Sequence, residues 1–224
     1  GARLLVDRLT GARWWGRRYA DPDQAGTTVA AAQLYQVLGV AVPRLRLAEL
    51  GGATWAVHPE PRAWDELGTE AVARWGHQLA AELPADAWIG NTGGPASMRA
   101  RQVEIPDSPG TLRLDLSACL AFRGPGKRDP TWAADELGEI RAALAAPPRS
   151  TLGKVYQVAR DQPERLAPMV SRVAAVTEAE IVASVDAGGL ADRARASRVA
   201  SLGGRRELVA GEFRRLIAGT IAGG

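Results

Sequence analysis

Residues 14–43, WWGRRYADPDQAGTTVAAAQLYQVLGVAVP, combine a strand pattern with the pattern of a capped helix. The tandem tryptophans at the start are typical of a strand. Asp21 or Asp23 can cap the beginning of the helix, and Gly39 can end it. The apolar stripe between them consists of Val29, Leu34, Val37 and Leu38. The stretch therefore predicts a strand followed by a helix that ends at Gly39.

Strand patterns lie on both sides of this helix. Residues 3–19 predict a hairpin that turns at Thr-Gly, and residues 40–50 and 53–58 predict two strands joined by a Gly-Gly turn. Pro59 and Pro61 then break the pattern. The resulting order, β-β-α-β-β, indicates a small β-rich part at the start of the chain.

The rest of the chain has mainly helical patterns. A helix is predicted over 62–83, and short strands are predicted at 101–105 and 111–117 around a turn. Further helices are predicted over 132–146, 150–159, 164–176, 177–189 and 205–221. Thr177 and Glu180 have the spacing of a capping box. We therefore expect an α+β protein with its boundary near residues 59–61 and a ligand cleft between the two parts.

The composition is that of an ordinary globular protein. The 224 residues are 46% apolar and 24% charged, with a net charge of +3 and a pI near 9.5. Basic residues are interspersed with acidic ones except in short runs such as RARASR (193–198) and GGRRE (203–207). We expect these runs to be solvated helix faces, and we expect no nucleic-acid partner.

The chain has few groups for metal or nucleophilic chemistry. Cys119 is the single cysteine and lies in an apolar run, which favours a buried hydrophobe. The two histidines, His58 and His77, lie far apart, so neither a zinc site nor a Ser-His-Asp hydrolase is expected. No apolar run approaches about 20 residues and no signal peptide opens the chain, so we expect a cytoplasmic protein with no membrane partner.

Two further segments, DAWIGNTGGP (86–95) and LRLDLSACLAFRG (112–124), follow residues 14–43. In this order the three segments resemble the lysine-and-glutamate, catalytic-loop and metal-binding segments of HipA-like and related phosphoinositide-kinase-like phosphotransferases, bacterial ones among them. The resemblance covers nearly the whole chain. It implies a two-lobed protein-kinase-like fold, with an N-lobe over 1–61 and a C-lobe over 62–224, and ATP and magnesium in the cleft.

The resemblance also implies a strand lysine on the nucleotide phosphates, at the place of Arg17 or Arg18. The first lysine of this chain is Lys127, so that group is missing. Arginine binds phosphate through a planar fork, which is not equivalent to an ammonium, and an exposed or cross-strand arginine is the other interpretation. The glutamate that orients the lysine is missing too, since no acid lies between Asp23 and Glu49.

The family's catalytic loop has an aspartate directly after Asn-Thr, where this chain has Gly93. Asp86 is the nearest carboxylate, and it is a candidate either for the catalytic base or for a brace at the end of the helix. Asn91 is a candidate for orienting the backbone of the loop. The family's second metal ligand, an asparagine, has no match in residues 96–102.

Asp115 matches the family's metal-binding aspartate. It follows a strand pattern and precedes a turn, where a carboxylate can hold magnesium, and a helix cap or a solvated strand end is the alternative. His58 lies directly before the Pro59–Pro61 break. It is a further candidate for nucleotide or phosphate binding where the lobes meet, with a structural role at the hinge as the alternative.

Four groups that phosphoryl transfer uses are thus missing: the lysine, the glutamate, the base and a metal ligand. Each lost electrostatic contact costs on the order of a hundredfold in rate. The sequence therefore favours a pseudokinase that binds a protein or peptide partner, with an exposed tryptophan as the sign of an interface. One alternative is a rewired phosphotransferase with Asp115 on magnesium, Arg17 or Arg18 on phosphate and Asp86 as base. The other is a different enzyme that reuses the cleft.

Overall fold

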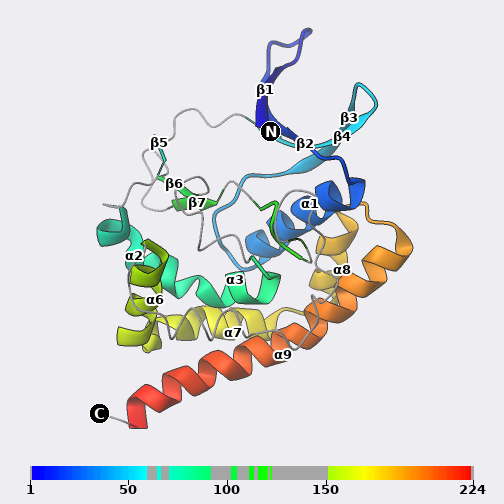
Figure 1. Cartoon of the computed structure of the whole chain (residues 1–224). Coiled ribbons are helices and arrows are strands. Elements are labelled where there is room, and N and C mark those ends of the chain that lie inside the picture. The colour runs from blue at the N-terminus through cyan, green and yellow to red at the C-terminus, as the bar shows by residue number, and fades with distance from the viewer. Residues whose placement is uncertain are drawn as a thin grey trace.

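The computed structural model describes residues 2–59, 65–66, 71–91, 102–104, 111–113, 116–120, 122 and 151–222. These residues form an α+β structure, with a four-stranded antiparallel sheet at the N-terminus and a mostly helical remainder (Figure 1). The α+β class expected from the sequence is therefore confirmed. Four elements of the sequence analysis lie outside the described residues: the helix over 132–146, the turn before the 111–117 strand, Gly93 and Asp115.

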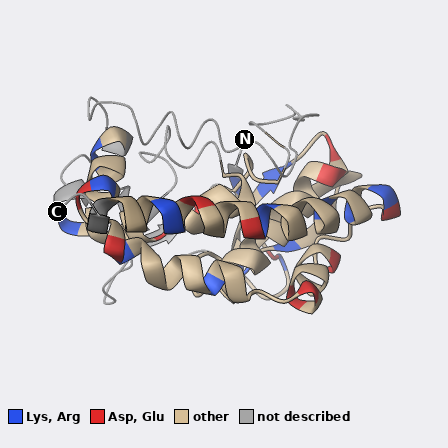
Figure 2. Ribbon diagram, turned by 90° about the horizontal axis from the view of Figure 1, so that it is seen from below, with Lys and Arg blue, Asp and Glu red and all other residues tan. Residues whose placement is uncertain are grey.

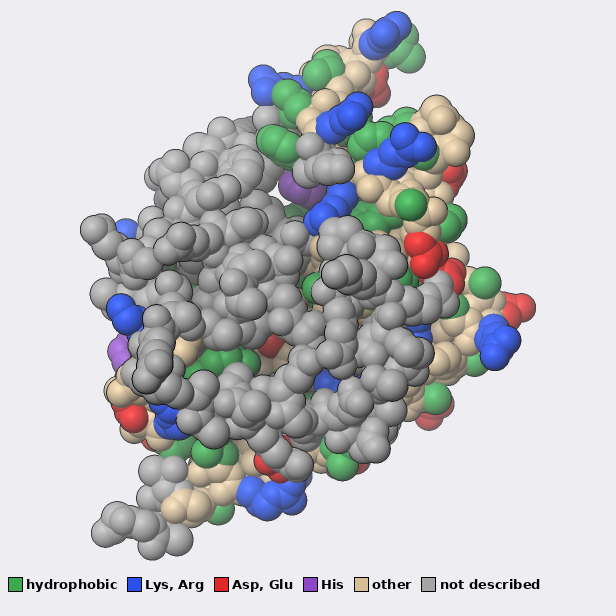
Figure 3. Space-filling view, in the orientation of Figure 1, with side chains coloured by type: hydrophobic (Ala, Val, Ile, Leu, Met, Phe, Trp, Pro, Cys, Tyr) green, Lys and Arg blue, Asp and Glu red, His purple; other side chains and the backbone are tan. Residues whose placement is uncertain are grey.

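The four strands are β1 (Ala2–Val6), β2 (Arg13–Arg18), β3 (Arg46–Leu50) and β4 (Ala53–Pro59). Their order in the sheet is β1-β2-β4-β3, with both hairpins where the sequence predicts them. Gly51 and Gly52 both have positive φ, as a two-residue hairpin turn requires. The strand expected from residue 40 begins only at Arg46. The β1–β2 hairpin projects from the rest of the molecule at the top of Figure 3.

Helix α1 (Pro22–Val37) lies between the sheet and the other helices. The side chain of Asp21 caps it by accepting a hydrogen bond from the Asp23 backbone N–H at 3.0 Å. The helix is buried on nearly all sides, because it packs against β3 and β4, against α3, and against α8 (Glu178–Asp186). Its close approach to the turn after α8 requires glycine, since a Cβ on Gly26 would lie 2.3 Å from the Gly188 carbonyl oxygen.

The helical part begins later than the sequence predicts. Residues 65–66, expected inside a helix over 62–83, form strand β5 (Asp65–Glu66), because they pair with Glu104 and Val103 of β6 (Gln102–Glu104). Strand β7 (Thr111–Arg113) completes this second antiparallel sheet, in the order β5-β6-β7. The remaining described helices are α2 (Ala71–Ala81), α3 (Leu83–Ile89), α6 (Thr151–Asp161), a 3-10 turn (Pro163–Leu166), α7 (Ala167–Ala175) and α9 (Asp192–Ala222).

The long helix α9 begins at Asp192, well before the predicted start at 205, and it closes the core from one side (Figure 1). Basic and acidic positions are interspersed along it (Figure 2). The expectation that its basic runs are solvated is wrong for Arg198 and Arg205, which are buried. Arg205 donates to the carbonyl oxygens of Trp88 at 3.1 Å and Ala87 at 2.6 Å, and so satisfies acceptors at the end of α3.

No helix among the described residues is long and apolar enough to cross a membrane.

Candidate functional site

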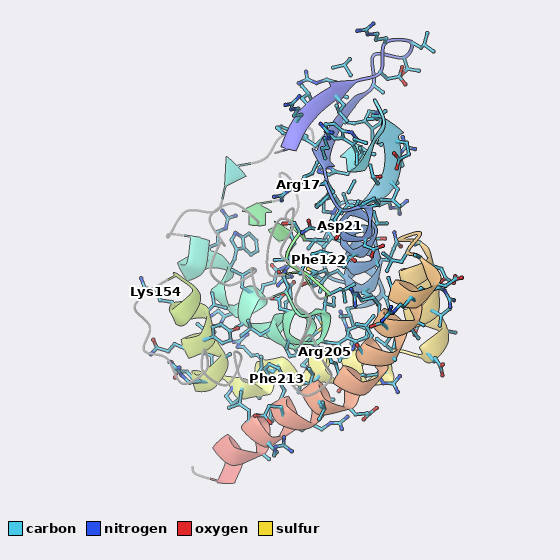
Figure 4. All side chains as sticks on the ribbon, turned by 45° about the vertical axis from the view of Figure 1, so that its right-hand side comes forward. Arg17, Asp21, Phe122, Lys154, Arg205 and Phe213 are labelled. Carbon is cyan, nitrogen blue, oxygen red and sulfur yellow. The ribbon has the colours of Figure 1, made fainter. Side chains whose placement is uncertain are left out.

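Arg17 and Arg18 point to opposite faces of the four-stranded sheet. Arg17 is partly buried and pairs with Ala56 of β4, whereas Arg18 is exposed and pairs with Trp55. The Arg17 side chain donates to the Ser117 hydroxyl at 3.1 Å, and its guanidinium carbon lies 5.8 Å from the centre of the Tyr19 ring. In Figure 4, Arg17 lies between the sheet and the segment that carries Phe122. Of the two candidate phosphate ligands, Arg17 therefore faces the interior.

The segment that Arg17 contacts, residues 116–120, is buried throughout. It is held from two further sides, because the Gln24 side chain donates to the Ser117 carbonyl oxygen at 2.9 Å and the Leu120 N–H donates to the Ile89 carbonyl oxygen at 3.0 Å. Leu120 has a φ of +48°, an uncommon conformation for a residue with a side chain. The residues directly after Asp115 are thus fixed against β2, α1 and α3, while Asp115 itself lies outside the described residues.

A buried polar network lies deeper in the same region, between α1, α3 and β7. Asp86 on α3 is its centre: its Oδ1 accepts from the Tyr35 hydroxyl at 2.5 Å, and its Oδ2 accepts from the Arg113 guanidinium at 2.9 Å. Arg113 also donates to Glu82, which lies at the start of α3, one helical turn before Asp86. Its guanidinium carbon lies 5.2 Å from the centre of the Tyr35 ring. Three segments that are far apart in sequence are joined here by one arginine.

The charges of this network do not cancel when both acids are ionised, because Arg113 alone faces Glu82 and Asp86. Burial raises the pKa of Asp86 above its ordinary value, while the positive charge of Arg113 and the Tyr35 hydroxyl act in the opposite direction. Burial and the nearby Asp86 raise the pKa of Tyr35 well above its ordinary value, so its hydroxyl remains a donor. Burial disfavours the Arg113 cation, but the carboxylates of Asp86 and Glu82 outweigh it and raise the Arg113 pKa.

This geometry bears directly on Asp86 as a candidate base. A raised pKa is useful to a general base, which works best near the operating pH. However, the base must also reach a substrate proton, and both carboxylate oxygens of Asp86 already accept hydrogen bonds inside the protein. The side chain is buried as well. Asp86 therefore braces α3 against α1 and β7, rather than capping the end of the helix.

Asn91 is the first residue after α3 and the left-handed Gly90 that ends it. Its backbone N–H donates to the Asp86 carbonyl oxygen at 2.9 Å, and its side-chain amide donates to the Tyr35 hydroxyl at 3.0 Å. Its Oδ1 is buried and has no hydrogen-bond partner among the described residues. Asn91 thus fixes the chain directly after α3 to the Tyr35–Asp86 pair.

His58 lies on β4, opposite Trp15 of β2. Because side chains alternate along a strand, it shares the interior-facing side of the sheet with Arg17. Its Nδ1 lies 2.8 Å from the Pro59 carbonyl oxygen, and burial lowers the pKa of the imidazole below its ordinary value. A neutral ring at pH 7 has no positive charge to offer a phosphate. No group of three or more His, Cys, Asp or Glu side chains in the described part of the chain is arranged to hold a metal ion.

Sequence reasoning missed the residues that surround these candidates: Gln24, Tyr35, Glu82, Arg113 and Ser117. One signal was available, because Glu82 and Asp86 lie four residues apart in an otherwise apolar stretch, which places two acids on one side of a buried segment. Their partner Arg113 also interrupts an apolar strand pattern. No family model, curated protein or solved structure matches the chain.

Proposed function

We propose that this chain is a kinase-like binding module that has given up phosphoryl transfer. The observation that carries the proposal is the hydrogen bonding of Asp86, whose two carboxylate oxygens are occupied by Tyr35 and Arg113. Since Gly93 stands where the resembling family has its catalytic aspartate, Asp86 is the nearest carboxylate in sequence that could replace it. A base that is buried and held in place by two hydrogen bonds is poorly placed to orient a substrate hydroxyl.

The helix that follows β2 supports the same conclusion. After Asp23, α1 contains no acidic residue, so it has no carboxylate to orient a phosphate-binding side chain on β2. Thr28, where the resemblance implies that acid, is buried and donates to the Gln24 carbonyl oxygen at 2.8 Å. Under this proposal, an arginine and neutral helix contacts stand where the resemblance implies the lysine–glutamate pair.

A rewired phosphotransferase is the second candidate, and one observation favours it. Arg17 contacts Ser117, two residues after Asp115, so a phosphate ligand and a metal ligand of the kind this activity requires belong to neighbouring segments. Arg17 on phosphate and Asp115 on magnesium would be its essential groups.

Nucleotide titration separates the two candidates. Thermal stability is measured against ATP concentration with and without magnesium, for the unmodified chain and for Arg17→Ala, Arg18→Ala and Asp115→Ala. The binding-module proposal expects no magnesium-dependent stabilisation at millimolar ATP. A ligand at a hundred times its dissociation constant adds about 2.7 kcal/mol to the unfolding free energy. A magnesium-dependent gain of that size that is lost in Arg17→Ala and Asp115→Ala, but kept in the matched surface variant Arg18→Ala, would overturn the proposal.

A further inference from the structure

Strand β1 is an edge of the four-stranded sheet, because it pairs only with β2 among the described strands. Asp7 and Ala12 close the hairpin: the Asp7 N–H donates to the Ala12 carbonyl oxygen at 2.9 Å. In an antiparallel pair every second residue bonds the neighbouring strand, so Leu5 and Arg3 bond β2 in the same way. The N–H and C=O groups of Leu4 and Val6 consequently point away from the sheet, along its open edge.

The same two residues carry exposed apolar side chains. Leu4 is 40% exposed and Val6 is 56% exposed, and both lie on the sheet face that includes Trp15, the partner of Leu4. Figure 3 shows hydrophobic and basic side chains together on the projecting hairpin. A strand that added to this edge would place every second side chain against Leu4 and Val6, and its backbone would satisfy their outward-pointing groups.

The turn of the hairpin keeps this edge in place. The Asp7 carboxylate accepts hydrogen bonds from the backbone N–H groups of Leu9 at 2.8 Å and Thr10 at 3.0 Å. The Thr10 hydroxyl in turn accepts from the Ala12 N–H at 3.2 Å. An edge that is already ordered loses little conformational entropy when it binds a partner.

The hairpin is strongly basic. Residues 2–18 contain five arginines and one acid, Asp7, whose carboxylate is engaged in the turn. Arg3 and Arg13 are exposed, and Arg3 lies on the face opposite to Leu4 and Val6 because it is the adjacent residue on β1. Arg13 pairs with Val6 and so lies on the same face as Leu4 and Val6. A partner strand therefore meets Leu4 and Val6 with Arg13 beside them on one face, and Arg3 and Leu5 on the other.

We propose that the β1 edge binds an extended acidic segment of a partner protein, which adds to the sheet as a fifth strand with alternating apolar and acidic residues. The apolar residues of that segment hydrogen-bond β1 and pack on Leu4 and Val6, and the acidic residues face the side of Arg3. Charge argues against a second copy of this chain on the same edge, since two hairpins with five arginines each would repel. None of the candidate residues Arg17, Asp86 and Asp115 lies on β1, so this inference does not depend on the proposed function.

The test uses the full chain and a fluorescein-labelled peptide of about ten residues in which valine alternates with glutamate. Fluorescence anisotropy is expected to show binding that weakens with added salt. Residues that hydrogen-bond each other across an antiparallel pair have their side chains on the same face. N-methylation of the valines is therefore expected to abolish binding. N-methylation of the glutamates, whose N–H groups point away from β1, is expected to leave binding unchanged.

Variants of the protein locate the site. Leu4→Pro removes an outward-pointing N–H that β2 does not use, and we expect it to weaken binding at least about tenfold. Arg3→Glu is also expected to weaken peptide binding. Leu9→Ser, at the tip of the hairpin where Leu9 is 97% exposed, is the matched control and should leave binding unchanged. Circular dichroism and thermal melting establish that each variant is folded.

Several outcomes would overturn the proposal. These are absence of binding at about 1 mM peptide, equal binding of both N-methylated peptides, or loss of binding in Leu9→Ser but not in Leu4→Pro. Self-association of the chain that Leu4→Pro abolishes would assign the edge to a second copy instead. Attachment of the hairpin to phosphatidylserine vesicles without any peptide binding would assign it to a membrane surface.

Discussion

Replacing Arg113 with methionine tests whether the buried network holds the three segments together. The substitution keeps an unbranched side chain of similar length but removes the cation between Asp86 and Glu82. The Arg113 side chain is only 4% exposed, so water cannot replace the lost charge. Breaking a buried ion pair by removing one partner typically costs about 3–5 kcal/mol, out of a total stability of about 5–15 kcal/mol. We expect a loss in that range at pH 7, equivalent to a fall in melting temperature of about 6–20 °C.

Urea unfolding followed by circular dichroism gives the loss directly. The destabilisation of Arg113→Met should shrink as the pH falls to about 4, because a protonated carboxyl needs no counter-charge. Adding Asp86→Asn to Arg113→Met should recover about 0.5–3 kcal/mol, since it removes one uncompensated carboxylate. Arg195→Met is the control: Arg195 pairs with Asp186 at the surface, and its loss should hardly change the midpoint.

Two results would refute this reasoning. A loss below about 1 kcal/mol for Arg113→Met at pH 7 would mean that the ion pairs contribute little beyond packing. A larger loss that stays the same between pH 7 and pH 4 would mean that the methionine packs poorly and that charge is not the cause.

Further substitutions test other features of the fold, each by urea unfolding. Gly16→Val should destabilise the protein by about 1–3 kcal/mol, since a Cβ on Gly16 would lie 2.6 Å from Leu5 Cδ1. Gly203→Ala, a helix position with nothing within 4 Å of the new Cβ, should instead stabilise it by about 0.5–1 kcal/mol. Thr177→Ala should cost about 1 kcal/mol through loss of the capping box at the start of α8. Burial raises the pKa of Asp86 from 3.8. The stability that this raised pKa contributes to the folded state is therefore fully present below pH 3.8, and it is lost as the pH rises through the raised pKa. The stability of wild type relative to Asp86→Asn should therefore fall over that interval.

The parts of the fold that the sequence predicts are those with local causes. Helix α1 begins and ends where Asp21 and Gly39 indicate, because a cap and a left-handed glycine act within one turn. The β3–β4 hairpin follows from its Gly-Gly turn, and the capping box at Thr177 follows from its spacing. Each of these features depends on residues that are neighbours in the chain.

The errors have causes that are distant in sequence. Asp65 becomes a strand residue because Glu104 pairs with it, and no pattern around residue 65 contains that information. Arg205 is buried because the end of α3 presents unsatisfied carbonyl groups to it, more than a hundred residues earlier in the chain. The Tyr35–Asp86–Arg113 network likewise joins three segments that are far apart in sequence, and no pattern within one segment identifies the other two. Pattern reading detects that such a residue is unusual but cannot identify its partner.

The network also limits what chemistry this region can perform. A general base gains and loses a proton in every cycle, so its surroundings must tolerate both charge states. To take a proton from a substrate, Asp86 would have to turn away from its partners, so that Tyr35 would lose its acceptor and Arg113 would be left with Glu82 alone. That change would loosen the attachment of α3 to α1 and β7, from which the chain continues toward Gly93 and Asp115. A residue that holds the region together by its fixed hydrogen bonds is poorly suited to act as its catalytic base.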